Sequence, residues 1–246
     1  YYDDINQPNL FVYCFGVEAS DLKFTSNDPQ YIKQLFVKQK GVLFKEVYVT
    51  AFTGVQTNAA AIKQTMERLG NDTRIGPQDV VLIFFSSHDL PSPDSTFNIE
   101  ARDYAPLAPT NTTLRYKQDV LAFLEKRPSK HVVLMDVCFS GGKAHPDISK
   151  VVAETPPGWV MLSSSTGYEL SFEHTDWQHC SFDYAIQQAL RQGKADKNND
   201  GQITLGELYD FLAKKVPAQN RSKNLTEQHP TIKKEGVEDT IIYVLK

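Results

Sequence analysis

The sequence has little cysteine: Cys14, Cys138 and Cys180 are the three among 246 residues. An odd count provides no disulfide framework, so it favours a disulfide-independent protein and a cytoplasmic rather than a secreted location. No apolar run approaches the roughly 18 residues that a membrane span needs, and the formal net charge is only −4. We therefore expect neither a membrane nor a nucleic acid as a partner.

The composition is ordinary for a globular protein, with 41% hydrophobic and 23% charged residues. A chain of this length can bury a sizeable core, and residues 1–246 are expected to form a single domain. Short apolar runs alternate with segments of helical spacing, which predicts an α/β fold with a mostly parallel sheet. Residues 91–116 are rich in Pro, Asn and Thr and predict an irregular insertion. The expected strands are 10–17, 47–49, 80–85, 132–137, 159–162 and 240–245, and the expected helices are 29–40, 59–69, 117–126, 182–192 and 205–216.

Two of the expected strands end in residues with catalytic chemistry. The strand 80–85 leads to His88, and the strand 132–137 leads to Cys138. If these strands are neighbours, both side chains emerge at the carboxyl edge of the sheet, where open α/β sheets bind ligands. A thiolate is a strong nucleophile, and a nearby imidazole accepts the proton and later returns it.

Each residue also has a structural interpretation. Taken alone, Cys138 is more typical of a buried core thiol and His88 of a hydrogen-bonded histidine. A zinc site is a further use of the same residue types, but no second pair of ligands lies at zinc spacing near either residue. The joint occurrence at two strand ends favours the catalytic interpretation.

The motifs around these two residues resemble those of caspase-like peptidases. The segments SSHD at 86–89 and DVCFSG at 136–141 are similar to the Ser-Gly-His-Gly and Asp-x-Cys-x-Ser-Gly patterns of that family, most of all to its metacaspase and bacterial caspase-like branch. The separation of about 50 residues between His88 and Cys138 is also that of caspases. The resemblance extends over nearly the whole chain and implies a caspase-like sandwich, with a central, mostly parallel six-stranded sheet flanked by helices.

The resemblance also implies catalytic roles. Cys138 would be the nucleophile and His88 the general base and acid, with the backbone N–H groups of Cys138 and Asp89 as the oxyanion hole. The family has Gly at the position of Asp89, and it has Gly at the position of Ser87. No cofactor is required for this chemistry.

By the same resemblance, a pocket for the residue before the cut bond would be lined by Thr25, Asp28, Ser86 and Asp136. Two carboxylates in one pocket suit a guanidinium or ammonium guest, so a protein or peptide substrate with Arg or Lys at that position is expected. Asp28 also fits a helix N-cap, which is the structural alternative for it. A carboxylate at the end of an apolar strand, such as Asp136, must find a partner.

The family is commonly divided into a large and a small part. Residues 1–142 correspond to the large part, 143–158 to a linker and 159–246 to the small part. A monomer is favoured, although the sequence does not define the oligomeric state.

A second motif in the small part resembles a calcium-binding EF-hand loop. Residues 196–207 place oxygen-bearing side chains at the required loop positions and Gly201 at position 6. The segment also fits a polar connector between two helices. The candidate calcium ligands are Asp196, Asn198, Asp200, Gln202 and Glu207.

These observations predict a cysteine endopeptidase with a Cys138–His88 dyad that cleaves after Arg or Lys. Two alternatives stay open. One is a catalytically weak or inactive caspase-like scaffold or interaction domain, which the substitutions at Ser87 and Asp89 favour. The other is a calcium-binding regulatory module, in which the loop 196–207 is the functional element.

Overall fold

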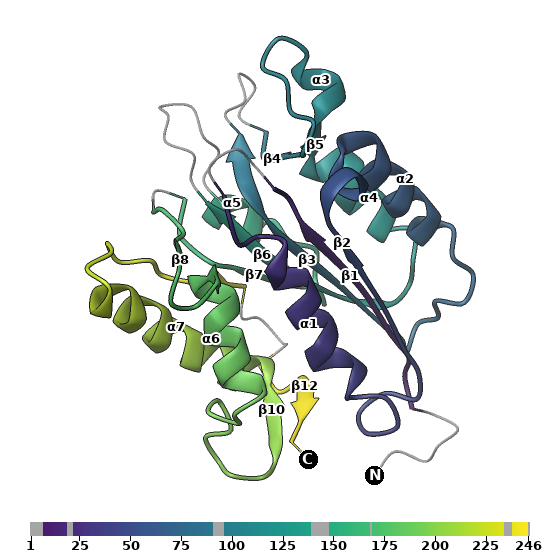
Figure 1. Cartoon of the computed structure of the whole chain (residues 1–246). Coiled ribbons are helices and arrows are strands. Elements are labelled where there is room, and N and C mark those ends of the chain that lie inside the picture. Colours follow the sequence, from purple (N-terminus) through teal and green to yellow (C-terminus); the bar gives the residue numbers. More distant parts are fainter. Residues whose placement is uncertain are drawn as a thin grey trace.

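The computed structural model describes residues 7–18, 22–90, 96–138, 148–167, 169–233 and 238–245, and it describes Cys138 through its backbone only. Helices cover both faces of a central sheet (Figure 1). The main path of the sheet has the strand order β11-β7-β6-β3-β1-β2. The five strands from β7 to β2 are parallel, whereas β11 is antiparallel to β7. The bounds are Leu10–Gly16 for β1, Val47–Phe52 for β2, Val80–Leu90 for β3, Lys130–Cys138 for β6, Val160–Ser163 for β7 and Thr231–Ile232 for β11.

The predicted mostly parallel sheet is therefore confirmed, but its sixth strand is not the expected one. The segment predicted as the last strand, 240–245, forms β12 (Ile241–Val244), which pairs with β10 (Gln202–Thr204) in a separate two-stranded sheet. An apolar run can pack equally well in either sheet, so its sequence pattern does not identify its pairing partner.

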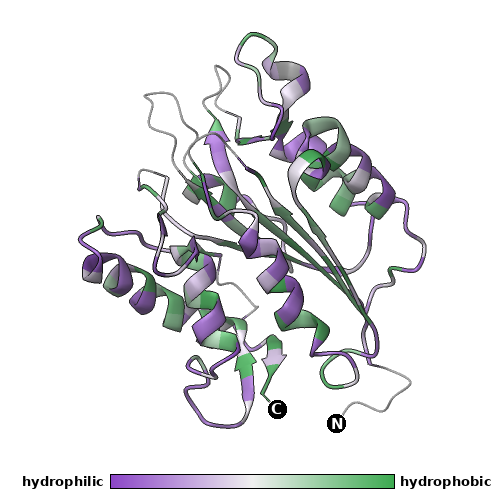
Figure 2. Cartoon of the chain, in the orientation of Figure 1, coloured by the Kyte–Doolittle hydropathy of each residue, from purple (hydrophilic) through white to green (hydrophobic). Residues whose placement is uncertain are grey.

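The helices form two layers. One layer consists of α1 (Asn27–Val37), α6 (Ser181–Leu190) and α7 (Leu205–Ser222), and the other of α2 (Ala59–Gly70), a π-helical turn η2 (Tyr116–Leu121), α4 (Ala122–Leu124) and α5 (Ile148–Ala153). Successive side chains of a strand point to opposite faces. In β3, Leu82 and Phe84 pack in the apolar core between the sheet and the layer of α1, α6 and α7. Ile83 and Phe85 pack in the core between the sheet and the other helical layer. Both faces of the strands are therefore apolar, as Figure 2 shows along the centre of the sheet.

The segment 91–116 is more ordered than predicted where the structure describes it. This segment contains β4 (Asn98–Glu100), α3 (Pro109–Thr112) and β5 (Thr113–Arg115). One further short helical element, η1 (Gly54–Thr57), lies earlier in the chain, between β2 and α2. The two short strands extend the sheet, because β4 pairs with the end of β3 and β5 pairs with β4. Three-residue strands are too short to show a period in the sequence.

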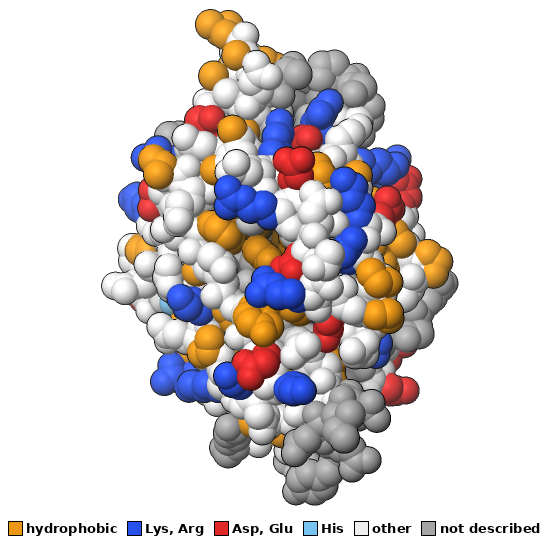
Figure 3. Space-filling model, turned by 90° about the vertical axis from the view of Figure 1, so that its right-hand side faces the viewer, with side chains coloured by type: hydrophobic (Ala, Val, Ile, Leu, Met, Phe, Trp, Pro, Cys, Tyr) orange, Lys and Arg blue, Asp and Glu red, His pale blue; other side chains and the backbone are white. Residues whose placement is uncertain are grey.

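The predicted linker 143–158 is also partly regular. Residues 143–147 lie outside the described part of the chain, but 148–153 form α5, where Ile148 and Val152 are buried against the sheet. In the part of the chain that the structure describes, no helix combines the length and apolarity of a membrane-crossing segment. Figure 3 shows one face of the surface, on which Lys and Arg side chains are interspersed with Asp and Glu.

Candidate active site

The two central strands bring the predicted catalytic residues into register. Strands β3 and β6 are parallel neighbours, with Ser86 opposite Asp136 and His88 opposite Cys138. His88 is 8% exposed. Because both strands run in the same direction, these four positions lie together at the carboxyl edge of the sheet. The side chain of Cys138 lies outside the described part of the structure.

The residue after the histidine, Asp89, has the backbone of an ordinary strand. It pairs with Ile99 of β4 and does not belong to the described non-glycine residues with positive φ. Alternation along β3 directs Asp89 to the face opposite that of His88. The neighbouring odd-numbered residue, Ser87, donates a hydrogen bond to the backbone carbonyl of Glu100 on that second face. The backbone at Asp89 therefore does not adopt the left-handed conformation that would favour glycine, so aspartate fits this position without backbone strain.

The residues predicted to line the acidic pocket lie on the face of the sheet that carries His88. The Ser86 hydroxyl donates to Asp28 Oδ2 at 2.8 Å, and the Ser171 hydroxyl donates to Asp136 Oδ1 at 2.8 Å. One oxygen of Asp28, one of Asp136 and the sulfur of Cys180 lie within 4.8 Å of one another. Each of these three residues is almost fully buried. Three of the four predicted pocket residues are thus gathered in one cluster.

The fourth predicted residue, Thr25, has a different local role. Its hydroxyl donates to the backbone carbonyl of Val17 at 2.7 Å and is buried. This bond ties the loop before α1 to the end of β1. Gly16 makes the close approach possible, because a Cβ at that position would lie 2.0 Å from the carbonyl oxygen of Thr25.

Asp28 does not cap helix α1. The N-cap residue is Ser26, without a side-chain capping bond, and Asp28 lies within the first turn. Besides Ser86, its carboxylate accepts a hydrogen bond from the backbone N–H of Cys180 at 3.4 Å and contacts His179 Nδ1 at 2.8 Å. The carboxylate is thus directed into the cluster at the sheet edge.

Several members of this cluster were not predicted from the sequence. His179 and Cys180 form β9, which pairs with β8 (Glu173–His174), and Asp183 lies in the first turn of α6. His179 Nδ1 is 3.0 Å from Asp183 Oδ2 as well as 2.8 Å from Asp28 Oδ1. The spacing of His179 and Asp183, four residues apart at a helix start, was the signal in the sequence, but it is common on protein surfaces.

The hairpin of β8 and β9 is fixed to the loop that precedes α1. The carboxylate of Glu173 accepts hydrogen bonds from the backbone N–H groups of Lys23 and Phe24. The side chain of Asn27 donates to the carbonyl of Gln178, whose φ of 55° turns the chain between the two strands. These contacts place His179 over the carboxylate of Asp28.

Burial and mutual repulsion control the protonation of the carboxyl groups. Burial, followed by the nearby charge of Asp28, raises the pKa of Asp136 to about 8. The same two causes raise the pKa of Asp183 to about 7. Burial alone would lower the pKa of His179, but its hydrogen bonds to Asp183 and Asp28 raise it to about 9. Near neutral pH the Asp136 carboxyl therefore carries little charge, and His179 is a cation.

The raised pKa of Asp136 leads to a prediction about stability. A carboxyl with a higher pKa in the folded than in the unfolded chain stabilises the fold only at low pH, and this contribution falls as pH rises from about 4 to about 8. Asp136→Asn removes the titration. We expect the variant to match the wild type near pH 4 and to melt at a higher temperature near pH 8, measured by circular dichroism. An unchanged difference in melting temperature across this range would contradict the assignment.

The calcium-loop residues are arranged as a polar turn. Asp196 Oδ2 accepts a hydrogen bond from the N–H of Gly201, and Gly201 has a φ of +78°. Glu207 forms a capping box with Thr204 at the start of α7. Among the described residues, the carboxylates of Asp196, Asp200 and Glu207 do not meet within 4.8 Å. Calcium binding by Asp196, Asn198, Asp200, Gln202 and Glu207 stays a prediction, which a calorimetric titration of the protein with Ca²⁺ tests.

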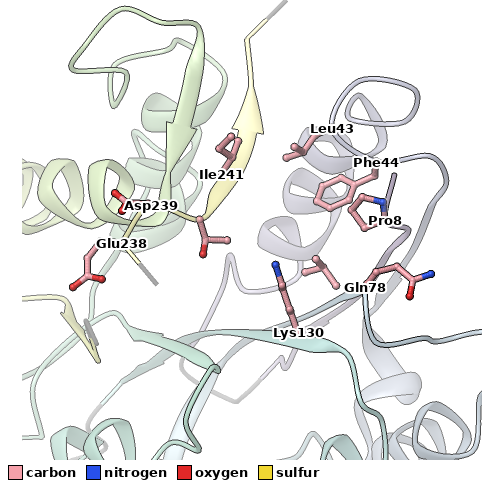
Figure 4. Close-up of a pocket in the computed structure, with 10 residues that line it drawn as sticks. Pro8, Leu43, Phe44, Gln78, Lys130, Glu238, Asp239 and Ile241 are labelled. Atoms are coloured by element: carbon pink, nitrogen blue, oxygen red, sulfur yellow. The ribbon is translucent and has the colours of Figure 1, made fainter. Parts of the chain in front are cut away.

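A separate cavity of about 510 Å³ lies at the opposite edge of the sheet, where β3 and β6 begin (Figure 4). Its lining combines the apolar side chains of Phe44 and Ile241 with the charged groups of Lys130 and Glu238. None of the residues that line it belongs to the catalytic pair or to the acidic pocket. The cavity is therefore not part of the candidate active site.

Comparison with known proteins defines the class of this fold and site. The family model of the caspase domain matches residues 11–241, so the chain belongs to the caspase domain family, a family of cysteine peptidases. No curated protein sequence matches the chain significantly.

Two solved structures show the same fold. A Geobacter sulfurreducens protein solved as a structural-genomics target is similar with a TM-score of 0.64 and 13% identity, over 97% of this chain and 100% of that one. Caspase-1 from Spodoptera frugiperda is similar with a TM-score of 0.57 and 15% identity, over 98% of this chain and 91% of that one. The predicted caspase-like fold is thereby confirmed, whereas its metacaspase branch stays a prediction.

Proposed function

We propose that this protein is a cysteine endopeptidase in which Cys138 is the nucleophile and His88 the general base and acid. The observation that carries the proposal is the register of β3 and β6, which sets His88 directly opposite Cys138 at the carboxyl edge of the two central strands. Membership of the caspase domain family supports the same roles. We also propose that residues 1–246 act as one peptidase domain and that the protein is a cytoplasmic monomer.

The mechanism that follows uses these two side chains and two backbone groups. His88 takes the thiol proton, and the Cys138 thiolate attacks the carbonyl carbon of the peptide bond. The N–H groups of Cys138 and Asp89 stabilise the negative oxygen that develops. His88 then protonates the leaving amine, and water hydrolyses the resulting thioester.

We further propose that the pocket formed by Asp28, Ser86 and Asp136 receives an Arg or Lys side chain before the cut bond. Its support is the pair of buried carboxyl groups, which a guanidinium or ammonium group can neutralise through charge-assisted hydrogen bonds. Asp136 Oδ2 has no hydrogen-bond partner among the described residues. An acidic side chain would be repelled by the same groups.

A positional-scanning library of fluorogenic peptides tests this proposal. We expect the highest kcat/KM for Arg and Lys before the cut bond, with at least about tenfold lower values for neutral residues, because a hydrogen bond to a charged group contributes about 1.5 kcal/mol or more. Cleavage after Asp at the same rate as after Arg would refute the acidic pocket. Absence of cleavage for every peptide would instead favour an inactive scaffold.

A further inference from the structure

The acidic pocket contains a positive charge of its own. His179 Nδ1 lies 2.8 Å from Asp28 Oδ1 and 3.0 Å from Asp183 Oδ2, so it bridges two carboxylates from different helices. The Asp28 and Asp183 side chains are fully buried, whereas His179 is 14% exposed. Histidine is thus the member of this group of three that reaches solvent, and it covers the carboxylates on that side.

The bridge resolves an electrostatic problem. Buried carboxylates that lack a cation or sufficient hydrogen bonds destabilise a fold strongly. Besides His179, Asp28 has two hydrogen-bond donors, the Ser86 hydroxyl and the backbone N–H of Cys180. Asp183 Oδ1 has no hydrogen-bond partner among the described residues. The hydrogen bonds to both carboxylates raise the pKa of His179 to about 9, against the opposing effect of burial. The negative charge that a basic guest would need is therefore already compensated.

We propose that His179 is the resident cation of this pocket. A basic substrate side chain binds by taking the place of the His179 imidazolium beside the Asp28 carboxylate. This inference rests on the proposed pocket for Arg or Lys. When the guest brings one positive charge, His179 releases one proton to solvent and becomes neutral. The charge of the pocket is conserved, and His179 becomes a residue that determines specificity rather than a catalytic one.

The titratable groups near His179 come from α1, α6, β6 and β8, and they define which protons can move. His174 of β8 lies directly opposite His179 in the hairpin. Asp28 and Tyr31 belong to α1, and the Tyr31 ring meets the imidazole edge-on at 5.6 Å. The Tyr31 hydroxyl accepts a hydrogen bond from Arg191, which follows α6. Asp136 of β6 has a carboxyl oxygen within 4.8 Å of one of Asp28 and is a second titrating group beside the pair. The groups to be considered are Asp28, Tyr31, Asp136, His174, Asp183 and Arg191.

The exchange links binding to pH. If one proton leaves for each basic side chain that enters, affinity rises by up to about tenfold per pH unit below the pKa of the releasing group. A peptide that ends in arginine, titrated into Cys138→Ala protein in two buffers of different ionisation enthalpy, measures the number of protons released. We expect close to one proton at pH 7 and an affinity that increases from pH 6 to pH 8.

Three substitutions identify the group that releases the proton. His179→Gln has no titrating group, so it should bind the peptide at least about tenfold more tightly at pH 6.5 and release less than half a proton. His179→Lys keeps the positive charge and should bind weakly at every pH. Asp136→Asn should keep the proton release. His229→Gln is the matched control and should behave as the wild type, because His229 is paired with Glu169 and Glu227 and not with the carboxylates of the pocket.

Several results would overturn the inference. These are an unchanged affinity and proton release in His179→Gln, a release lost in Asp136→Asn but kept in His179→Gln, or no binding of the arginine peptide. If His179→Gln does not fold, the Cys138→Ala protein alone provides the test. An affinity for the peptide that does not change between pH 6 and pH 8 would then overturn the inference. Peptide binding with proton release in a protein without peptidase activity would support the inference while refuting the proposed function.

Discussion

Cys138→Ala and His88→Ala are each expected to remove essentially all peptidase activity, because a nucleophile and its base act as a unit. The proteins should stay folded, since both residues lie near the carboxyl ends of β3 and β6 and not at the centre of the sheet. Hydrolysis of an arginine fluorogenic peptide measures the loss, and near-UV circular dichroism reports the fold. Wild-type turnover in Cys138→Ala would show that the assignment of the nucleophile is wrong.

The other two thiols allow a sharper version of this experiment. Cys14 is fully buried and Cys180 is 2% exposed, and burial, followed by the charge of Asp183, raises the pKa of the Cys14 thiol. A thiol of this kind reacts slowly with electrophiles. An arginine-bearing acyloxymethyl ketone should therefore label the protein once, at Cys138, as peptide mass spectrometry can establish. Label at Cys180 instead would place the nucleophile in the acidic pocket and contradict the proposed mechanism.

The second large effect is expected at the pocket carboxyl groups. Asp28→Asn should lower the preference for arginine over citrulline by at least about tenfold, since it removes a charge-assisted interaction of about 1.5 kcal/mol or more. Asp136→Asn should have an effect of this size only above pH 8, where the Asp136 carboxyl is mostly ionised. Citrulline has the shape of arginine without its charge, so the ratio of kcat/KM values separates the lost charge from a general disturbance of the site.

The pH dependence provides a further check on Asp136. Its pKa of about 8 means that the empty pocket holds it mainly protonated at pH 6 and about half ionised at pH 8. The effect of Asp136→Asn on arginine selectivity should therefore be larger at pH 8 than at pH 6. Asp210→Asn, on the exposed side of α7, is the control for a loss of one negative charge. Equal selectivity in Asp136→Asn and Asp210→Asn would exclude Asp136 from the pocket.

The sequence alone was sufficient for the class of fold and for the position of the candidate catalytic residues at one edge of the sheet. Buried parallel strands carry apolar residues on both faces, and this local property makes β1, β3 and β6 recognisable in one dimension. Residues that directly follow such strands must lie at one edge of the sheet. The sequence therefore predicts that His88 and Cys138 are neighbours, and the register of β3 and β6 places them opposite each other.

The sequence was less informative where strands are short or their partners distant. Strand β12 pairs with β10 rather than with the main sheet, and its Tyr243 packs against Phe36 of α1, with ring centroids 6.3 Å apart. The strands β4 and β5 have three residues each and owe their structure to the end of β3. Neither property is visible in hydrophobic periodicity, because periodicity describes the exposure of a segment and not the identity of its neighbour.

The acidic pocket shows the same division within a single site. The positions of Asp28, Ser86 and Asp136 followed from the sequence through the resemblance, since each lies next to a recognisable strand or helix start. The contact of His179 with Asp28 joins residues 151 positions apart and exists only because a two-stranded hairpin docks beside α1. Charge compensation between buried groups depends on distances of a few ångströms in three dimensions. The tertiary structure alone therefore decided that the pocket predicted for a basic guest already holds a cation.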